Sequence, residues 1–398
     1  MLVIAAPGQG AQAPGFLAPW LELPGVRDRI AAWSDLAGCD LIAYGTTASA
    51  EEIKDTAVAQ PLLVAAGIAA AEVLFGDLDQ AQQQVDIVAG HSVGELTAGT
   101  IAGVLAPEDA MNLVRVRGQA MARAAALVPT GMTAVLGGDE AEVLDAIEKH
   151  GLTPANINGG GQVAAAGTLE QLAAFAADPP ARARLRPLSV AGAFHTTHMD
   201  PAVDALRAAA AGTAVGEPAV VLLSNRDGAA AASGSDWLDR IVTQVRAPVR
   251  WNMCMQSMTG LGATALIELP PAGTLTGLAR RGMPGVALAN LKTPDDLDAA
   301  RSLIAEHGTL DPHQDGHVPE WRLLVAPLAG TFRSGAGDPA AAAPGATITS
   351  GAEIGHVEQR GGRHVIIPPF PATIIEWLVE DGDPVSVGQP LVRLQPAE

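Results

Sequence analysis

The stretch Val85-Asp86-Ile87-Val88-Ala89-Gly90-His91-Ser92-Val93-Gly94-Glu95 decides the fold of the N-terminal part of this chain. Residues 85–89 are rich in β-branched and small apolar side chains, which predicts a short buried strand. A Gly-x-Ser-x-Gly pattern centred on Ser92 follows, and a helix is expected from Val93. A strand, a sharp turn and a helix in this order are the local plan of an α/β fold with a parallel sheet.

The glycines on either side of Ser92 predict a nucleophile elbow, because residues without a Cβ let the backbone turn sharply. The Ser92 hydroxyl is then exposed at the carboxyl edge of the sheet. The N–H of Val93 lies at a helix start, where it can stabilise an oxyanion. A Gly-rich turn with a purely structural role remains the alternative interpretation.

A serine hydroxyl needs a base to act as a nucleophile. Among nine histidines, His91 is expected to point away from Ser92. His195 is the better candidate, because it lies in a turn of small residues after a strand-like segment at 188–190. His198 remains a competitor on spacing alone.

Composition limits the function classes. The chain of 398 residues has a formal net charge of −19, and an acidic chain repels nucleic acid and anionic membranes. No apolar run is expected to reach about 18 residues and no charged leader is present, which predicts a cytoplasmic protein without a membrane span. Cys39 and Cys254 lie in no metal-binding spacing, so we expect free thiols and no metal site.

The sequence predicts three parts. Residues 1–307 form the α/β body, and at about 125–190 short strands alternate with amphipathic helices as a small α+β insert. Residues 308–320 are polar and rich in turn formers, which is typical of a linker. Residues 321–398 contain short β-rich segments between Gly- and Pro-rich turns and predict an all-β domain.

Several motifs, in order, make roughly residues 1 to 305 resemble the malonyl-CoA:acyl-carrier-protein transacylases and the acyltransferase domains of polyketide synthases. The motifs are Pro7-Gly8-Gln9-Gly10-Ala11-Gln12, Gln60-Pro61, Gly90 to Glu95, Val116-Arg117-Gly118, Asn158 to Val163, Phe194-His195, Gln244 to Trp251 and Leu275-Thr276-Gly277-Leu278. One departure is the run Leu269-Pro270-Pro271-Ala272-Gly273, where the family usually has a Gly-Pro-Gly turn, so this turn is expected to be built differently.

The resemblance implies an α/β-hydrolase-like body with a ferredoxin-like insert. It implies transfer of malonyl from malonyl-CoA to the phosphopantetheine thiol of an acyl carrier protein, through an acyl-serine, in fatty-acid or polyketide biosynthesis. Coenzyme A enters only as the thioester substrate, and neither a metal nor a bound cofactor is expected.

The resemblance also assigns catalytic roles. Ser92 attacks the thioester, and His195 takes its proton and returns it to the leaving thiol. The main-chain carbonyl of Gln244 orients His195, where a Ser-His-Asp triad uses a carboxylate. The N–H groups of Gln9 and Val93 form the oxyanion hole.

Substrate recognition is assigned to a second set of residues. Arg117 pairs with the free malonyl carboxylate, which a planar guanidinium fits bidentately. Phe194 fills the space that an α-methyl group would need, so malonyl is favoured over methylmalonyl. The resemblance places Gln60, Met121 and Asn158 in the same pocket. The expected docking residues for coenzyme A or the acidic carrier are clustered arginines, namely Arg182, Arg184, Arg186, Arg280 and Arg281.

Two other functions remain open at this level. The same Ser-His pair could hydrolyse thioesters or esters, although editing hydrolases of this family commonly lack the arginine that Arg117 supplies. A non-catalytic scaffold is the third class of function, which intact Ser92, His195 and Arg117 disfavour.

Residues from about Trp321 to Glu398 resemble a biotinyl/lipoyl carrier domain. In that family a lysine at a hairpin tip receives biotin, but here Gly361 falls at that position and no lysine follows Lys292. Amide attachment needs a lysine amine, so we expect neither biotin nor lipoate on this domain. Two roles stay open, a packing element or a docking module for a partner such as an acyl-CoA carboxylase.

Overall fold

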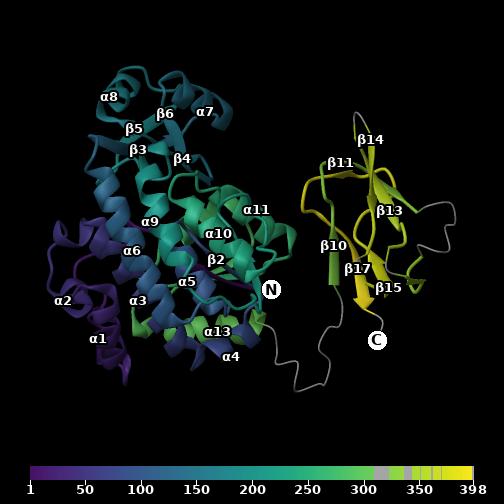
Figure 1. Cartoon of the computed structure of the whole chain (residues 1–398), viewed down its shortest axis with the longest axis horizontal. Coiled ribbons are helices and arrows are strands. Elements are labelled where there is room, and N and C mark those ends of the chain that lie inside the picture. Colours follow the sequence, from purple (N-terminus) through teal and green to yellow (C-terminus); the bar gives the residue numbers. More distant parts are fainter. Residues whose placement is uncertain (309–321, 336–342, 350, 360–361, 369, 397–398) are drawn as a thin grey trace. The chain divides into compact units, whose positions relative to one another are not determined.

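The computed structural model describes residues 1–308, 322–335, 343–349, 351–359, 362–368 and 370–396. The chain divides into two compact units, Met1–Asp311 and Pro312–Glu398, each with its own core (Figure 1). The first contains a parallel sheet with helices and the second contains antiparallel sheets, which confirms the predicted fold class. Most of the predicted linker and Gly361 lie outside the described residues.

Five parallel strands form the main sheet of the first unit. In sheet order they are β7 (Val221–Leu223), β2 (Ile87–Gly90), β1 (Leu2–Ala6), β8 (Ala265–Glu268) and β9 (Ala287–Asn290). Both faces of β1 are buried, since Leu2 and Ile4 pack into one core and Val3 and Ala5 into another. This is the pattern of a parallel sheet covered by helices on both sides. Parallel strands end at one edge, so the loops after β1, β2 and β7 meet there.

Helices cover both faces of this sheet. Those that contribute to the larger core are α1 (Val26–Ala37), α2 (Leu41–Thr46), α3 (Thr56–Phe75), α4 (Leu78–Gln84), α5 (Gly94–Ile101), α6 (Pro107–Ala125), α9 (Asp200–Ala210), α10 (Gly234–Gln244) and α13 (Leu297–His307). The opposite face packs against α11 (Trp251–Gly260) and α12 (Leu275–Gly282).

The central helix α3 corrects one expectation. By length and composition it could cross a membrane, with a mean hydropathy of 1.8, whereas the sequence predicts no apolar segment of that length. In its apolar 18-residue window 89% is buried within the protein, and a helix that is apolar on all sides is typical of a protein core. Its closest partners are α5 and α6, so its apolar length is explained by packing.

An antiparallel sheet is inserted between α6 and α9 and forms the lobe at the top of the first unit in Figure 1. Its strands in sheet order are β4 (Thr153–Gly159), β5 (Gln162–Thr168), β3 (Thr130–Gly137) and β6 (Ala183–Pro187). With α7 (Glu140–Lys149) after β3 and α8 (Leu169–Ala177) after β5, the chain order is that of a ferredoxin-like fold.

The prediction of a strand-like segment at 188–190 is wrong. The N–H of Leu188 still donates to the Met132 carbonyl at 2.9 Å, but the N–H of Val190 turns back to the Leu188 carbonyl at 3.0 Å. The chain therefore leaves the sheet after Pro187. In a strand, the Val190 N–H would bond to a neighbouring strand, but here it bonds to a carbonyl within its own tight turn.

The second unit consists of two four-stranded antiparallel sheets. One has the order β10 (Arg322–Val325), β17 (Pro390–Pro396), β15 (Ala372–Trp377), β12 (Thr347–Ile348), and the other β14 (Gly362–Ile366), β13 (Gly355–Gln359), β11 (Gly330–Ser334), β16 (Pro384–Val385). Phe332 and Val357 from one sheet share a core with Ile374 and Leu394 from the other. The unit is therefore a small β-sandwich with a β13–β14 hairpin.

Candidate active site

Ser92 lies in the turn between β2 and α5, at the carboxyl edge of the parallel sheet. Its φ is 54°, in the left-handed region that costs a non-glycine residue about 1–2 kcal/mol. A Cβ on Gly90 would lie 1.9 Å from the main-chain carbon of Gly94, and a Cβ on Gly94 would lie 2.2 Å from the Ala6 oxygen. The two glycines are thus required by close backbone approach, as the predicted elbow demands.

Gly94→Ala is expected to destabilise the protein by more than about 3 kcal/mol, because the added Cβ overlaps backbone atoms of a buried strand end. Equilibrium denaturant unfolding measures this change. Gly277→Ala in α12 is the matched control, since nothing lies within 4 Å of its added Cβ, and we expect a gain of about 0.5–1 kcal/mol there. Wild-type stability in Gly94→Ala would show that the elbow can relax.

His195 faces the nucleophile. Its Nε2 lies 2.7 Å from Ser92 Oγ, and its Nδ1 lies 2.9 Å from the main-chain oxygen of Gln244. A carbonyl only accepts, so Nδ1 carries the ring proton and Nε2 is left to accept the serine proton. His195 itself has a φ of 61°, so both members of the pair are held in a strained backbone conformation. The hydroxyl thus pairs with His195 rather than with the competitor His198.

His91 is directed elsewhere, as expected. Its Nε2 lies 2.9 Å from the Asn158 side-chain oxygen, and its ring centroid is 5.7 Å from that of Trp251. The structure therefore places Asn158, a predicted substrate residue, against His91 and near the elbow.

Burial gives His195 the protonation state of a base. Desolvation, with the nearby positive charge of Arg117, lowers the pKa of His195 to about 3. The ring is therefore neutral near pH 7, when it must accept a proton.

This pKa predicts how stability depends on pH. Unfolded histidine titrates near pH 6.5, so the stabilisation that His195 contributes is fully present above that pH and is lost as the pH falls toward 3. Between pH 6.5 and about pH 4, the free energy of unfolding of the wild type should therefore decrease relative to that of His195→Gln, while the raised pKa of Glu95 acts in the opposite direction in both proteins. Denaturant titrations at several pH values test this. Parallel slopes for the two proteins would contradict a neutral buried His195.

Arg117 reaches the nucleophile from α6. The residue is 1% exposed, its Nη1 donates to Gln60 Oε1 at 2.7 Å, and its Nη2 donates to Gln244 Oε1 at 2.6 Å and to Ser92 Oγ at 3.2 Å. Burial lowers the pKa of Arg117 to about 10, so the group stays charged at neutral pH. A buried guanidinium held by neutral oxygens beside the nucleophile can receive a carboxylate.

The remaining predicted pocket residues lie close by. Gln60 also donates to Met121 Sδ at 3.4 Å, which ties α3 to α6. Phe194 is buried in the larger core, next to His195 in the chain. A Cβ on Gly192 would lie 2.6 Å from the Ala125 Cβ, so only glycine lets this loop approach α6.

Two main-chain donors point to an oxyanion hole. In the described part of the chain, no protein acceptor pairs with the N–H of Gln9 or of Val93. Their loops lie in contact, because the His91 N–H donates to the Ala6 oxygen at 2.9 Å and a Cβ on Gly8 would lie 2.6 Å from the His91 oxygen. The Gln9 side chain is anchored separately, on the Lys54 oxygen at 3.1 Å.

Two residues that hold the site together, Glu95 and Asn225, have no role predicted from the sequence. Asn225 Oδ1 accepts the Ser92 N–H at 2.7 Å, Asn225 Nδ2 donates to the Gly90 oxygen at 2.7 Å, and its main-chain N–H donates to Glu95 Oε1 at 2.9 Å. Glu95 Oε2 accepts from Gln244 Nε2. The sequence feature that could have identified Glu95 is an acidic side chain in the first turn of a largely apolar helix. Asn225 lies 133 residues from Ser92 and could not be found from spacing.

The predicted docking arginines are exposed. Arg184 and Arg186 lie on the edge strand β6, with Arg182 just before it, and Arg280 and Arg281 end α12. Arg281 Nε donates to the Gly160 oxygen at 3.2 Å, which connects α12 to the β4–β5 loop. Within the described residues, neither group is hydrogen-bonded to the catalytic residues.

The turn that departs from the family pattern is organised by Glu268. Ala272 and Gly273 both have positive φ, at 49° and 109°. The buried Glu268 carboxylate accepts from four consecutive main-chain N–H groups at the start of α12, those of Gly273, Thr274, Leu275 and Thr276. A carboxylate at a helix N-terminus satisfies the first unpaired donors of the helix.

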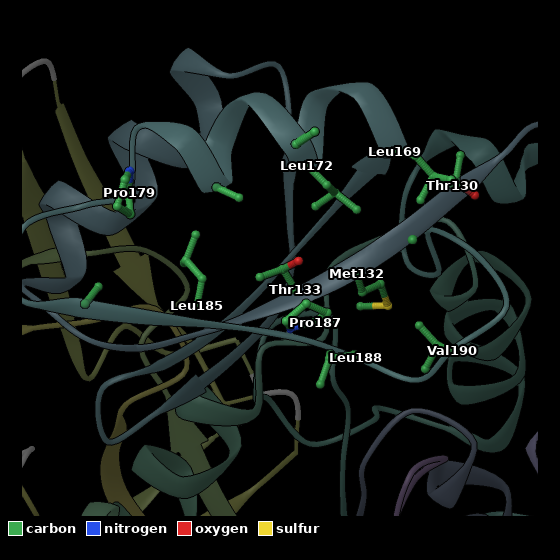
Figure 2. A pocket seen from close by; sticks show the side chains of 14 residues that line it. Thr130, Met132, Thr133, Leu169, Leu172, Pro179, Leu185, Pro187, Leu188 and Val190 are labelled. Carbon is green, nitrogen blue, oxygen red and sulfur yellow. The ribbon is translucent and has the colours of Figure 1, made fainter.

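An apolar cavity of about 660 Å³ lies in the insert, apart from this site (Figure 2). Side chains of β3, α8 and β6 line it, among them Met132, Leu172 and Leu185, and none of the predicted site residues does. The cavity is connected to the site only indirectly. Thr130, which lines the cavity, accepts the N–H of Ala193 at 3.0 Å, and Ala193 lies two residues before His195.

Known proteins share this arrangement over most of the chain. Residues 6–301 match the acyl transferase domain family. The chain is 53% identical over 303 residues to the malonyl CoA-acyl carrier protein transacylase of Mycobacterium tuberculosis H37Rv, which covers 76% of this chain and 100% of the relative. It is 34% identical over 307 residues to that of Escherichia coli K12, with 75% and 97% covered.

Solved structures agree. The crystal structure of the M. tuberculosis transacylase superposes with a TM-score of 0.72 at 52% identity, over 75% of this chain and 98% of that one. A malonyl-transacylase solved in complex with a type II polyketide acyl-carrier protein gives 0.69 at 31% identity, over 75% and 98%. With this sequence identity, this fold and this serine–histidine site, the chain belongs to the acyl transferase family, together with the malonyl CoA-acyl carrier protein transacylases.

Proposed function

We propose that this chain transfers malonyl from malonyl-CoA to the phosphopantetheine thiol of an acyl carrier protein, in cytoplasmic fatty-acid or polyketide biosynthesis. The observation that carries the proposal is Arg117, a buried cation whose Nη2 lies 3.2 Å from Ser92 Oγ. Its direct hydrogen-bond partners are neutral oxygens, so the guanidinium can pair with an anion that enters the site. The malonyl carboxylate, separated from the thioester carbonyl by one methylene group, is an anion of the required reach.

In the loading half-reaction, Ser92 Oγ attacks the thioester carbonyl carbon while His195 Nε2 takes the hydroxyl proton. The developing oxyanion is stabilised by the N–H groups of Gln9 and Val93. The carbon–sulfur bond then breaks, and the leaving coenzyme A thiolate takes the proton from His195. The carrier thiol attacks the malonyl-Ser92 ester by the same steps in reverse.

The rival reaction is hydrolysis by the same pair. Incubation with malonyl-CoA and a phosphopantetheinylated bacterial acyl carrier protein distinguishes the two, with malonyl-carrier and free malonate both quantified by mass spectrometry. We expect malonyl-carrier as the main product. Free malonate in excess, with carrier present, would identify a hydrolase, and no turnover of either kind would favour a scaffold.

For the exposed arginines we propose docking of the acidic carrier or the coenzyme A phosphates. The exposure of these side chains supports this, and Arg281 lies where α12 meets the β4–β5 loop. In an acidic chain, a local cluster of cations is what an anionic partner would use.

For the second unit we propose a carrier-like domain without biotin or lipoate that docks a partner such as an acyl-CoA carboxylase component. The supporting facts are its two antiparallel sheets and the absence of lysine from the sequence after Lys292. Co-purification of the full chain with a carboxylase, lost on deletion of residues 312–398, would support docking. A lower melting temperature of the shortened chain would instead support a packing role.

A further inference from the structure

A buried carboxylate lies behind the substrate site, and the proposed mechanism does not use it. Glu95 is 1% exposed, in the first turn of α5. One oxygen accepts the Asn225 N–H at 2.9 Å and the other accepts from Gln244 Nε2. The same Gln244 amide presents its oxygen to Arg117 Nη2 at 2.6 Å. One side-chain amide therefore connects the buried anion to the buried cation.

This connection fixes the orientation of the Gln244 amide. An ionised carboxylate only accepts hydrogen bonds and a guanidinium only donates them, so the amide nitrogen must face Glu95 and the amide oxygen must face Arg117. Gln244 also holds the catalytic base, through its main-chain oxygen 2.9 Å from His195 Nδ1.

The charges around Glu95 balance before substrate binds. Arg117 from α6 supplies one positive charge. His195 is neutral because burial lowers its pKa, and the Cys254 thiol from α11 is neutral because burial and Glu95 raise its pKa. A malonyl carboxylate paired with Arg117 adds a second buried anion for one cation, and an uncompensated buried charge is strongly disfavoured.

We propose that Glu95 is a positioning residue that takes up a proton when the malonyl carboxylate binds to Arg117, which keeps the site neutral and releases Arg117 from Gln244. This inference rests on the proposed function. The proton is placed on Glu95 Oε2, and the Gln244 amide turns so that its oxygen accepts from the new O–H. The Gln244 amide nitrogen then faces the malonyl carboxylate, which accepts from it and from Arg117.

The pKa of Glu95 in the substrate-free protein suits this role. Burial raises the pKa of Glu95 to about 7, against the opposing effects of its hydrogen bonds and of Arg117. A group that titrates near neutral pH can exchange its proton as its partner changes. The acyl transfer itself moves the serine proton to the coenzyme A thiol and consumes none from solvent, so uptake by Glu95 can be measured separately.

The experiment is proton uptake during single-turnover loading with malonyl-CoA, in lightly buffered solution with an indicator dye at about pH 7.5. Acyl-enzyme is quantified in the same samples by intact mass. We expect roughly half a proton per acyl-enzyme for the wild type, since a pKa of about 7 that rises by about one unit changes the protonated fraction by that amount. Glu95→Gln, which mimics the protonated acid, should load malonyl without this uptake.

Glu142→Gln is the matched control, because Glu142 also lies in a first helical turn, that of α7, but is exposed; we expect wild-type uptake there. Coenzyme A is released in every sample, so ionisation of its thiol cancels. Equal uptake in wild type and Glu95→Gln would overturn the proposal. Absence of acyl-enzyme in the wild type would instead contradict the proposed function.

A second measurement does not depend on the folding of a variant. In the wild type, kcat/KM for malonyl-CoA should fall about fourfold between pH 7 and pH 8.5 and then level off, because a Glu95 pKa that rises from about 7 by about one unit couples the proton to malonyl by at most about tenfold. A flat profile up to about pH 8.5 would overturn the proposal. Where Glu95→Gln is folded, its profile should be flat over this range.

Discussion

Ser92→Ala is expected to lower the rate of malonyl transfer by a factor on the order of 10⁴ or more, because no other group in the site can form the acyl-enzyme. The hydroxyl lies 2.7 Å from His195 Nε2, which can take its proton, and 3.2 Å from Arg117 Nη2. The rate of malonyl-carrier formation with saturating malonyl-CoA measures the loss. A residual rate within about a hundredfold of wild type would show that Ser92 is not the nucleophile.

Ser92→Gly separates the lost hydroxyl from the strained backbone. Both variants lack the nucleophile, but glycine adopts a φ of 54° without the steric cost that alanine retains. We expect the glycine variant to be more stable than the alanine variant by about 1 kcal/mol in denaturant unfolding. The reverse order would mean that the elbow is not strained in solution.

Arg117→Ala is expected to reduce kcat/KM for malonyl-CoA by about 10²–10⁴-fold. The malonyl carboxylate would be buried without its partner, a loss of about 3–5 kcal/mol for one member of a buried pair. Arg117→Lys should recover only part of this, since an ammonium lacks the fork that binds both carboxylate oxygens. Steady-state kinetics with malonyl-CoA measure both effects.

Arg115→Ala is the control for Arg117, two residues away on the same helix. The Arg115 guanidinium donates to the Leu36 carbonyl at 3.0 Å and has no part in the proposed site, so kcat/KM should stay within about twofold of wild type. Acetyl-CoA is the substrate control, because it has no free carboxylate and should not lose reactivity in Arg117→Ala. Equal losses for malonyl-CoA and acetyl-CoA would contradict a carboxylate-binding role.

The elbow could be predicted from local sequence, because its cause is local. Gly90 and Gly94 are each required by contacts of less than 2.5 Å that any Cβ would make, and such a constraint is visible as a glycine pattern. The strands of the insert were recognised for a similar reason, since apolar segments and turn formers alternate over short distances.

Other features depend on groups that only the fold brings together. Asn225 reaches Ser92 across 133 residues, and nothing in the local sequence marks it. Glu95 lies at the end of the Gly90–Glu95 motif, but its role follows from Gln244 and Arg117, which come from other helices. The apolar length of α3 is explained by its burial, which depends on helices that lie elsewhere in the chain. The segment after Pro187 has the composition of a strand, yet a local turn removes it from the sheet.

The most direct test of malonyl transfer through Ser92 is intact-protein mass spectrometry of the wild type and Ser92→Ala after brief exposure to saturating malonyl-CoA, followed by peptide mapping. We expect one malonyl group per wild-type chain, on the peptide that contains Ser92, and none on Ser92→Ala. An unmodified wild type, or a malonyl group on another residue, would contradict transfer through Ser92.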